Sequence, residues 1–172
     1  MVTNDAPTLL VVCDAGPLIH LDQLNCLDLL ADFSRIVVPD VVWREVEHHR
    51  PTALEKKTIR LERLKSRKEP SAELSSLHRL LALHAGEVQA LQLAQELSAD
   101  LLLTDDTAAR LAAKTLHLSA HGTLGILLRA IRRRQRTPEE ILNVLNALPT
   151  RSTLHVKRAL LDEIIRQVEE LR

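Results

Sequence analysis

Short apolar runs alternate with longer amphipathic stretches along most of the chain. Four continuous aliphatic runs predict buried strands at 9–13, 36–39, 101–104 and 116–119. Amphipathic spacing predicts helices over 17–31, 40–49, 53–66, 71–84, 86–98, 106–114, 122–134, 138–147 and 155–171. The stretch 50–85 is compatible either with two helices or with an excursion from the main fold. Buried strands separated by helices predict an α/β protein whose parallel sheet is covered on both faces.

The length and the absence of repeats or linkers predict a single domain. This domain covers 1–172, with a core at about 9–136 and a C-terminal helical extension at about 137–172. Lys and Arg together number 23, as do Asp and Glu, so the net charge gives no overall attraction to nucleic acid. Trp43 and Phe33 are the only Trp, Tyr or Phe residues. This composition argues against an RNA binder that works by stacking bases on aromatic rings.

The cysteines and the N-terminal sequence predict where the protein is located. Cys13 and Cys26 lie in apolar segments without metal-type spacing, which predicts buried free thiols in a reducing compartment. The sequence "MVTNDAPTLLVVCD" has no basic segment, and its apolar run is too short for a signal peptide or a membrane span. We therefore expect a cytoplasmic protein that does not interact with membranes.

Three aspartates follow two of the predicted strands directly. Asp14 comes after the first strand, and Asp105 and Asp106 come after the run "LLLT". In a parallel sheet, ligands bind beyond the carboxyl ends of the strands, where these side chains emerge. A loop acid that bonds nearby amides is an equally reasonable interpretation of Asp14 alone. A helix cap accounts for one member of the Asp105–Asp106 pair but not for both.

Two glutamates are predicted to lie on the apolar faces of their helices. In "VVWREVEHH", Glu45 shares a face with Val42 and Val46, which places it in the buried stripe. In "GEVQALQLAQELS", Glu87 aligns with Leu91 and other apolar residues. A carboxylate that points toward a core is costly unless it is paired or bound to a metal. For Glu87 the favourable helix dipole in the first turn is a structural alternative.

These five acids predict a site for a hard divalent cation. Their motifs contain no dedicated Lys or Arg, so clustered carboxylates would repel one another or take up protons. Ligands that offer only oxygen suit Mg²⁺ or Mn²⁺, and the lack of Cys or His at these positions argues against zinc. Such ions promote in-line attack on phosphodiesters by activating water and stabilising the leaving oxygen.

Four motifs together resemble those of the PIN-domain nucleases, and most closely the toxin-like branch related to the VapC type. They are "DAGPLIHL", "VVPDVVWREV", "HAGEVQALQLAQELSADLLLTDDTAAR" and "GTLGILLRA". The resemblance implies a three-layer, Rossmann-like PIN domain, a parallel sheet flanked by helices, here with extra C-terminal helices. It also implies Mg²⁺- or Mn²⁺-dependent cleavage of RNA by a toxin that a small antitoxin protein holds, often as a homodimer.

The resemblance also implies roles for individual residues. It gives catalytic roles to Asp14, Glu45, Glu87 and Asp106, and metal-binding roles to Asp14, Glu87, Asp105 and Asp106. Within the adjacent pair, Asp106 matches the metal ligand, and Asp105 orients it or caps the following helix. Ala15 departs from the family pattern, which frequently has a hydroxyl residue beside the first aspartate. The long basic stretch at 54–68 is a second departure. For its charged residues, within 55–69, a solvated helix face is the preferred interpretation and a phosphate-binding surface is the alternative.

Substrate contacts are predicted at Thr123, Arg129 and Arg132, although each residue has a structural alternative. Thr123 fits a helix cap, and the two arginines fit a helix C-terminus, where cations are favoured. The functional alternative to a nuclease is a non-catalytic PIN-like scaffold or regulator that binds RNA or protein. A phospho-accepting receiver domain is disfavoured because it would carry its acid pair after the first strand.

Overall fold

The computed structural model describes residues 9–172, and it contains a five-stranded parallel sheet. The strand order is β3-β2-β1-β4-β5, and every pairing is parallel. The strands are β1 (Leu10–Cys13), β2 (Arg35–Pro39), β3 (Leu61–Leu64), β4 (Leu101–Leu103) and β5 (Ala120–His121). The predicted α/β class is therefore confirmed. Residues 1–8, on which part of the expectation about a signal peptide falls, lie outside the described residues.

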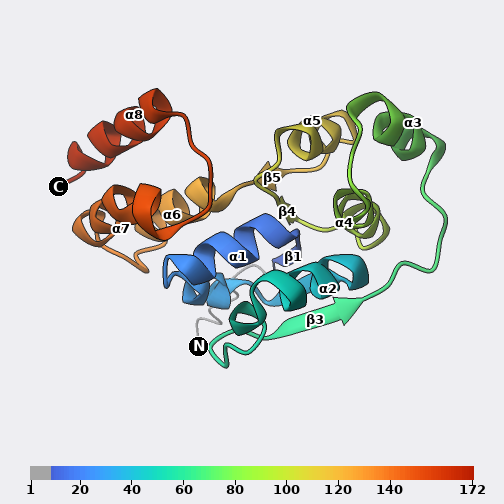
Figure 1. Cartoon of the computed structure of the whole chain (residues 1–172), viewed down its shortest axis with the longest axis horizontal. Helices are drawn as coiled ribbons and strands as arrows, with labels where there is room; N and C mark the ends of the chain where they lie inside the picture. The colour runs from blue at the N-terminus through green and yellow to red at the C-terminus, as the bar shows by residue number, and fades with distance from the viewer. Residues whose placement is uncertain (1–8) are drawn as a thin grey trace, which may run out of the picture.

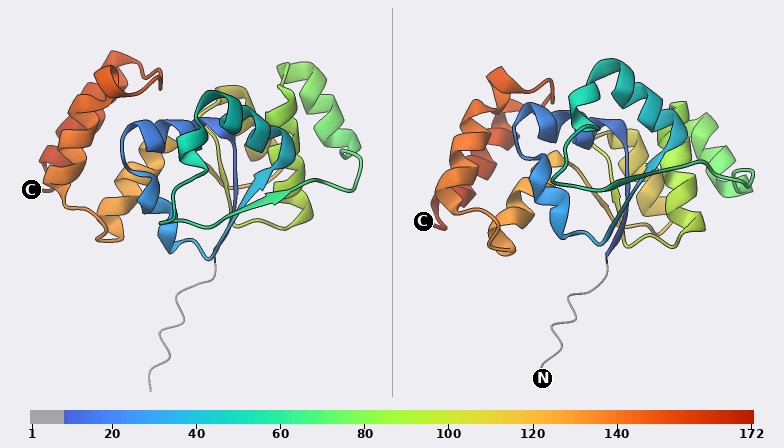
Figure 2. Two further views of the ribbon diagram at one scale, coloured as in Figure 1. Left: turned by 60° about the horizontal axis from the view of Figure 1, so that its bottom comes forward. Right: turned by 90° about the horizontal axis from the view of Figure 1, so that it is seen from below.

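Helices cover both faces of the sheet and make three layers (Figures 1 and 2). The α-helices are α1 (Ala15–Gln23), α2 (Asp40–His49), α3 (Ala72–Leu81), α4 (Ala85–Glu96), α5 (Thr107–Thr115), α6 (Thr123–Arg132), α7 (Pro138–Arg151) and α8 (Arg158–Glu169). Two short 3-10 helices are η1 (Leu27–Asp32) and η2 (Pro51–Ala53). No helix within residues 9–172 is both long enough and apolar enough to cross a bilayer.

Alternation along the strands creates two separate cores. Val11 and Cys13 point to one face, where they pack with α1, α2, α6 and the C-terminal helices. Val12 points to the other face and packs with α3, α4 and α5. Successive side chains of a strand point to opposite faces, so a strand covered on both sides needs apolar residues at every position. This requirement explains the unbroken aliphatic runs of β1, β2 and β4.

The helix predicted over 53–66 is wrong, because its second half forms the edge strand β3. The run Leu61–Leu64 pairs with β2, with Ile36 opposite Leu61 and Pro39 opposite Leu64. Its charged side chains are neutralised locally, as in the ion pair of 2.6 Å between Arg35 and Glu62. An edge strand tolerates charge because one side of it is not covered by a neighbouring strand. The sequence pattern therefore resembles that of an amphipathic helix.

Two further boundaries differ from the prediction. The strand predicted over 116–119 is instead the turn after α5, which ends at Thr115, and His117 in this turn has a left-handed backbone with φ of 57°. The actual strand β5 lies just after it. The helix predicted over 17–31 is interrupted at Asn25, where φ is 55°, so that α1 ends at Gln23 and the 3-10 helix η1 follows. Both breaks come from single residues whose backbone leaves the helical region.

The sheet topology places the carboxyl ends of β1 and β4 next to each other. Cys13 lies opposite Leu103, and the Asp14 N–H donates to the Leu103 carbonyl at 2.9 Å. The chain leaves β1 toward β2 on one side, whereas β4 lies on the other side, so the strand order reverses between β1 and β4. Ligands of open α/β sheets bind at such a reversal. The residues after these two strands are consequently placed where a ligand would bind.

Candidate active site

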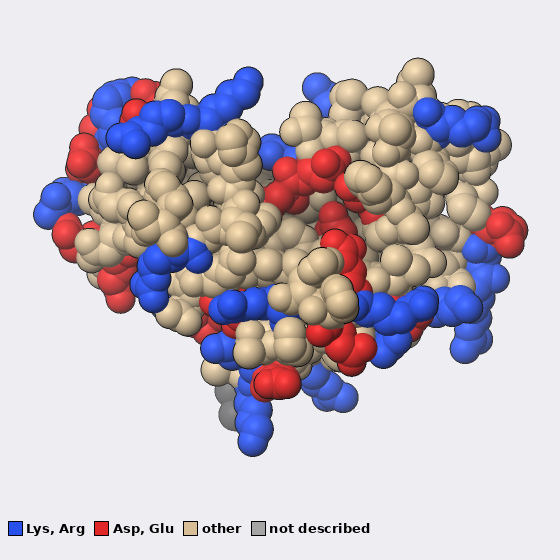
Figure 3. Space-filling model, in the orientation of Figure 1, with Lys and Arg blue, Asp and Glu red and all other residues tan. Residues whose placement is uncertain are grey.

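An acidic cavity of about 350 Å³ lies beyond the carboxyl ends of β1 and β4. Its lining includes all five acids singled out in the sequence, namely Asp14, Glu45, Glu87, Asp105 and Asp106. Figure 3 shows acidic side chains gathered in the hollow between the C-terminal helices and the α4–α5 side of the molecule. Within residues 9–172, no Lys or Arg lines this cavity. The fold therefore concentrates negative charge at this place without compensating it by lysine or arginine.

Asp14 is the most buried of these acids. It is the N-cap of α1, and its Oδ1 accepts the Ala15 N–H at 2.9 Å while its Oδ2 accepts the Thr104 hydroxyl at 2.9 Å. Burial raises the pKa of Asp14 to about 6, and repulsion by Glu87 and Glu45 adds to the rise, although the two hydrogen bonds oppose it. The ionised form of Asp14 is thus destabilised in the absence of a cation.

Asp105 is the centre of a hydrogen-bond network that joins three elements. Its Oδ2 lies 2.7 Å from His20 Nδ1 on α1 and accepts the Thr123 hydroxyl at 2.7 Å, while its Oδ1 accepts the Thr123 N–H at 2.6 Å. Thr123 is fully buried at the start of α6. Asp105 therefore fixes the end of β4 against α1 and α6, and both of its oxygens are engaged.

Asp106 is the residue that caps α5. Its Oδ1 accepts the Ala109 N–H at 2.7 Å, and its own N–H donates to Thr104 Oγ1 at 3.3 Å. In the expectation from the family resemblance, Asp106 matches the metal ligand, and Asp105 either orients it or caps the following helix. The capping part of that expectation is reversed, because the chain enters α5 one residue later than predicted and Asp106 occupies the cap position.

The two glutamates differ in how they reach the cavity. Glu87 is largely buried and closes a capping box on α4, where its Oε2 accepts the His84 N–H at 2.7 Å. Glu45 is exposed, which corrects its predicted position in the buried stripe of α2. The buried stripe consists of Val42 and Val46, and Glu45 lies at its flank, over Gly86. A Cβ at Gly86 would lie 3.4 Å from Glu45 Oε2 and 3.8 Å from Asp14 Oδ1, so the glycine separates the two acids.

The donor set fits a hard divalent cation, although the carboxylates are not yet arranged around one point. Within residues 9–172, no three His, Cys, Asp or Glu side chains are placed to hold an ion together. Local hydrogen bonds account for this, because Asp14, Glu87, Asp105 and Asp106 each accept one from a nearby backbone N–H. Every acid offers only oxygen. Burial, with a smaller contribution from the neighbouring Glu87 and Glu45, raises the pKa of Asp14, and a bound cation would favour its ionised form.

The predicted substrate-binding residues lie apart from the acidic cavity. Arg129 is largely buried, its Nη1 donates to both oxygens of Asp32 at 2.7 and 2.8 Å, and its guanidinium lies over the Phe33 ring. Arg132 is exposed on α6 and is not part of the cavity lining. Thr123 contacts Asp105 as described above, and its hydroxyl is inaccessible to solvent. These positions favour structural roles for Thr123 and Arg129.

Several residues of the site are not evident from the sequence. His20 holds Asp105, Thr104 bridges Asp14 and Asp106, and His155 lines the cavity from the segment between α7 and α8. Gly122 is required because a Cβ there would lie 2.6 Å from Asp105 Oδ1. Thr104 could have been found from its place between a buried strand and two aspartates. Nothing in the local sequence marks His155, because its contribution depends on how the C-terminal helices fold back.

The comparison with family models identifies the chain. The family model DUF3368, described as a PIN domain, matches residues 10–170. The chain therefore belongs to the PIN-domain family, which confirms the family resemblance inferred from the sequence motifs. No curated protein matches the chain. PIN domains are typically nucleases, and PIN-domain nucleases generally use divalent metals.

Proposed function

We propose that this protein is a Mg²⁺- or Mn²⁺-dependent endoribonuclease that cleaves phosphodiester bonds of RNA. The observation that carries the proposal is the gathering of five carboxylates in one cavity that no Lys or Arg lines within the described residues, in a chain of the PIN family. An acid cluster that served only stability would be neutralised by nearby cations. An uncompensated cluster is suited to bind an external cation.

Asp14, Glu87 and Asp106 are the residues we assign to the metal, with Glu45 at the mouth of the cavity. Bound there, the ion would lower the pKa of a water molecule and offset the charge of the attacked phosphate. Asp14 and Asp106 keep their carboxylates in place by capping α1 and α5. Asp105 is assigned to positioning, since both of its oxygens are held by His20 and Thr123.

The exposed position of Glu45 suits a group that handles protons. An exposed carboxylate can accept a proton from the attacking water and release it to solvent, whereas buried Asp14 cannot exchange protons as freely. Gly86 leaves the space between Glu45 and Asp14 open to a phosphate. In this arrangement Asp14, Glu87 and Asp106 would bind the metal ion, and the exposed Glu45 would transfer the proton.

The cleavage experiment uses purified protein, RNA, and either Mn²⁺, Mg²⁺ or EDTA. We expect cleavage with either metal, none in EDTA, and none for Asp106→Asn, whose Asn still caps α5. Asp162→Asn is the matched control, because Asp162 is an exposed acid on α8 that pairs with Arg158. Cleavage that persists in EDTA, or in Asp106→Asn, would exclude this mechanism. Metal-independent RNA binding without cleavage would support the scaffold alternative instead.

We further propose that the nuclease is the toxin of a toxin–antitoxin pair in the cytoplasm, and that it forms a homodimer. The support is the resemblance of its motifs to the VapC-type branch. A small protein that covered the acidic cavity would silence cleavage. Expression of the chain alone should arrest growth, and co-expression of the neighbouring small gene should restore it. Normal growth with a catalytically active protein would contradict the toxin role and leave the nuclease assignment intact.

A further inference from the structure

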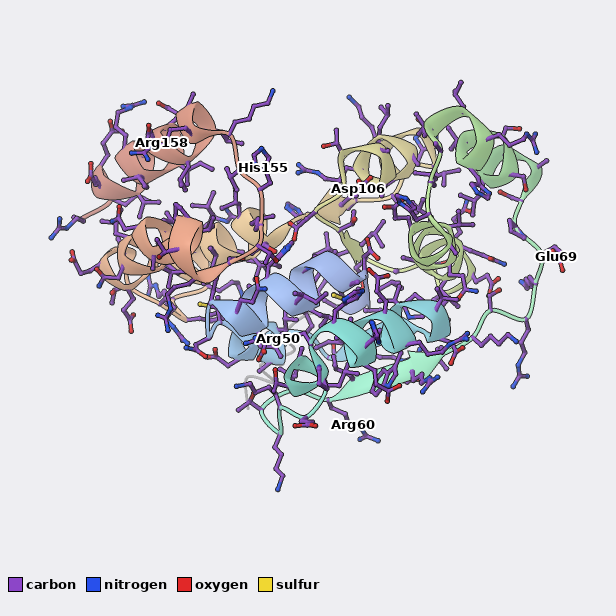
Figure 4. The ribbon with its side chains drawn as sticks, in the orientation of Figure 1. Arg50, Arg60, Glu69, Asp106, His155 and Arg158 are labelled. Carbon is purple, nitrogen blue, oxygen red and sulfur yellow. The ribbon has the colours of Figure 1, made fainter. Side chains whose placement is uncertain are left out.

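A second hollow opens directly beside the acidic cavity, between α5 and the C-terminal helices. This α5–α8 groove has a volume of about 580 Å³ and is lined by Arg110, His121, Lys157, Leu160 and Ile164, among others. It shares Asp105, Leu154 and His155 with the acidic cavity, so the two hollows are continuous. Figure 4 shows His155 and Asp106 on opposite sides of the cleft between the C-terminal helices and α5.

The groove carries positive charge that the fold leaves unpaired. Arg110 and Lys157 are exposed, and neither forms an ion pair with any residue in the described part of the chain. Many arginines elsewhere, such as Arg44 and Arg172, are paired with carboxylates. Burial lowers the pKa of His121, and the charges of nearby arginines, Arg110 included, lower it further. The groove is thus cationic where the adjoining cavity is anionic.

The positive surface continues along α5. A third hollow is lined by Thr107, Arg110, Lys114 and His117, and it shares Thr107 and Arg110 with the α5–α8 groove. Lys114 is exposed and unpaired among residues 9–172. The three hollows therefore form one path that runs from the acidic cavity past Arg110 to Lys114. A path of this kind fits an extended ligand with regularly spaced negative charges.

The walls of the groove are apolar rather than aromatic. Leu160 is 51% exposed and lines the groove together with Leu124, Val156 and Ile164. Aliphatic side chains make no hydrogen bonds to base edges, so a wall of this kind offers little sequence readout, which depends mainly on polar groups at base edges. Cations beside a surface of this kind match the combination of charged backbone and apolar faces in a nucleic acid strand.

We propose that the α5–α8 groove binds single-stranded RNA, with Arg110 and Lys157 each holding a backbone phosphate next to the one presented to the acidic cavity. This assignment rests on the proposed nuclease function and adds to it the path of the substrate. Because the acidic cavity repels phosphate, cations immediately beside it are needed to hold the strand. A continuous path between two helices takes one strand, whereas duplex RNA is recognised across its wide minor groove.

The basic stretch 55–69 is the competing surface, and its geometry favours it less. Arg63 pairs with Asp40 and Lys56 lies near Asp22, so part of its charge is already used. Arg60 projects from the far side of the molecule relative to His155 (Figure 4). Arg60 and Lys65 are exposed and unpaired among residues 9–172. They provide a matched control pair for Arg110 and Lys157.

The test measures fluorescence anisotropy of a short labelled oligouridylate with the full-length protein in EDTA, where the proposed cleavage does not occur. We expect Arg110→Ala/Lys157→Ala to weaken binding about a hundredfold, or about tenfold for each charged side chain. The log–log slope of affinity against salt should become shallower by about 0.7 for each phosphate that the variant no longer neutralises. Arg60→Ala/Lys65→Ala should bind like the wild type. Thermal unfolding of each variant checks that the fold is retained.

Wild-type affinity of the groove variant, or weakened binding confined to the control variant, would overturn the proposal. No binding by the wild-type protein at low salt would also overturn it. Binding that is insensitive to salt and to both substitutions would likewise overturn it, because the strand would then be held outside both basic surfaces. The two proposals can be rejected separately. Oligonucleotide binding in the groove without cleavage in Mn²⁺ would refute the nuclease function. Cleavage that is unaffected in Arg110→Ala/Lys157→Ala would refute only the assignment of the groove as the RNA-binding path.

Discussion

Two buried aspartates at opposite ends of α1 illustrate how the fold treats structural and functional charge. Asp22 is 2% exposed, and its Oδ2 accepts hydrogen bonds from Arg50 Nε and Thr52 Oγ1, both at 2.7 Å. Burial alone would raise the pKa of Asp22, but the hydrogen bonds from Thr52 and Arg50 and the charges of Arg50 and Lys56 outweigh it and lower the pKa. Asp14 is 7% exposed and pairs with no Lys or Arg among residues 9–172, and its pKa rises to about 6.

The two aspartates show how an acidic functional site can be distinguished from an acidic structural feature. The protein neutralises Asp22 with its own arginine and lysine, so that carboxylate needs nothing from solution. At Asp14 the nearest charges are the carboxylates of Glu87 and Glu45, which make ionisation harder. A carboxyl group with a raised pKa that lines a cavity, next to other acids, is typical of a functional site. The contrast predicts that Asp14→Asn and Asp22→Asn differ in their effect on cleavage and have opposite effects on stability at pH 7.5.

The largest expected effect is on cleavage. Asp14→Asn should reduce the rate at least about a hundredfold, because the variant loses a negatively charged metal ligand while its side chain keeps the same shape. Asp22→Asn should change the rate by less than about threefold, since Asp22 does not line the acidic cavity. The measurement is the initial rate of RNA cleavage in Mn²⁺. If both variants lost the same share of the cleavage rate, the different environments of Asp14 and Asp22 would have no bearing on cleavage.

The next largest effect is on stability without metal. Because the folded pKa of Asp14 is about 6 and the ordinary value is 3.8, its contribution to stability is lost as the pH rises between these values. The loss amounts to about 3 kcal/mol above pH 6. Asp14→Asn should therefore unfold at higher urea concentration than wild type at pH 7.5, but not at pH 4.

Asp22→Asn is the control for this pH dependence. Because the pKa of Asp22 is lower in the folded protein than in the unfolded chain, ionised Asp22 stabilises the fold at any pH above the ordinary pKa. This stabilisation is lost as the pH falls through the pKa of the folded protein. We expect a cost of about 1 kcal/mol at pH 7.5, at the low end because Arg50 and Lys56 are more than a third exposed. Stabilisation of Asp22→Asn, or destabilisation of Asp14→Asn at pH 7.5, would reverse the comparison and refute it.

A smaller effect separates the adjacent Asp105 and Asp106. Asp105→Asn should cost about 1 to 2 kcal/mol in unfolding free energy, because one of its oxygens is replaced by an NH₂ group that cannot accept from Thr123 or His20. Asp106→Asn should leave stability within about 0.5 kcal/mol of wild type, since Asn is as good an N-cap as Asp. Urea unfolding in EDTA measures both. If Asp106→Asn is the less stable variant, Asp106 rather than Asp105 is the acid that holds the surrounding structure in place.

The smallest effect is expected at Gly86. A Cβ there would lie 3.3 Å from Val42 Cγ2 and 3.4 Å from Glu45 Oε2, so Gly86→Ala must displace Val42 by a few tenths of an ångström and brings a methyl group into contact with Glu45. Alanine has a higher helix propensity than glycine, and this gain offsets the cost of crowding. The free energy of unfolding should therefore stay within about 1 kcal/mol of wild type. Cleavage should fall severalfold with little change in unfolding. An unaffected rate would show that the position of Glu45 does not matter to the reaction.

The central strands and the sheet class could be predicted from the sequence, whereas the edge strands could not. The residues of β1, β2 and β4 are covered on both faces, and this requirement leaves an unbroken aliphatic signal. The edge strand β3 carries Glu62 and Arg63, whose charges are satisfied only by Arg35 and Asp40 from elsewhere in the chain. The two-residue strand β5 is too short to produce a pattern.

The acids of the site could be located from the sequence, but their partners could not. Carboxylates placed directly after strands, or in the first turn of a helix, follow from local patterns, and these patterns point to Asp14, Glu87 and Asp106. The exposure of Glu45 depends on how α4 packs against α2, and the hydrogen bond between His20 and Asp105 joins residues far apart in sequence. Interactions of this kind are set by tertiary packing and leave no local signal.

The most direct test of the central claim is a calorimetric titration of Mn²⁺ into the RNA-free protein. We predict that wild type and Asp22→Asn bind the ion at pH 7.5 and that Asp14→Asn does not. Because the pKa of Asp14 is about 6, binding to the wild type at pH 6 should also release protons, which buffers of different ionisation heat detect. Equal Mn²⁺ binding by all three proteins, or none by a wild-type protein that still cleaves RNA, would contradict the assignment of the acidic cavity as the metal site.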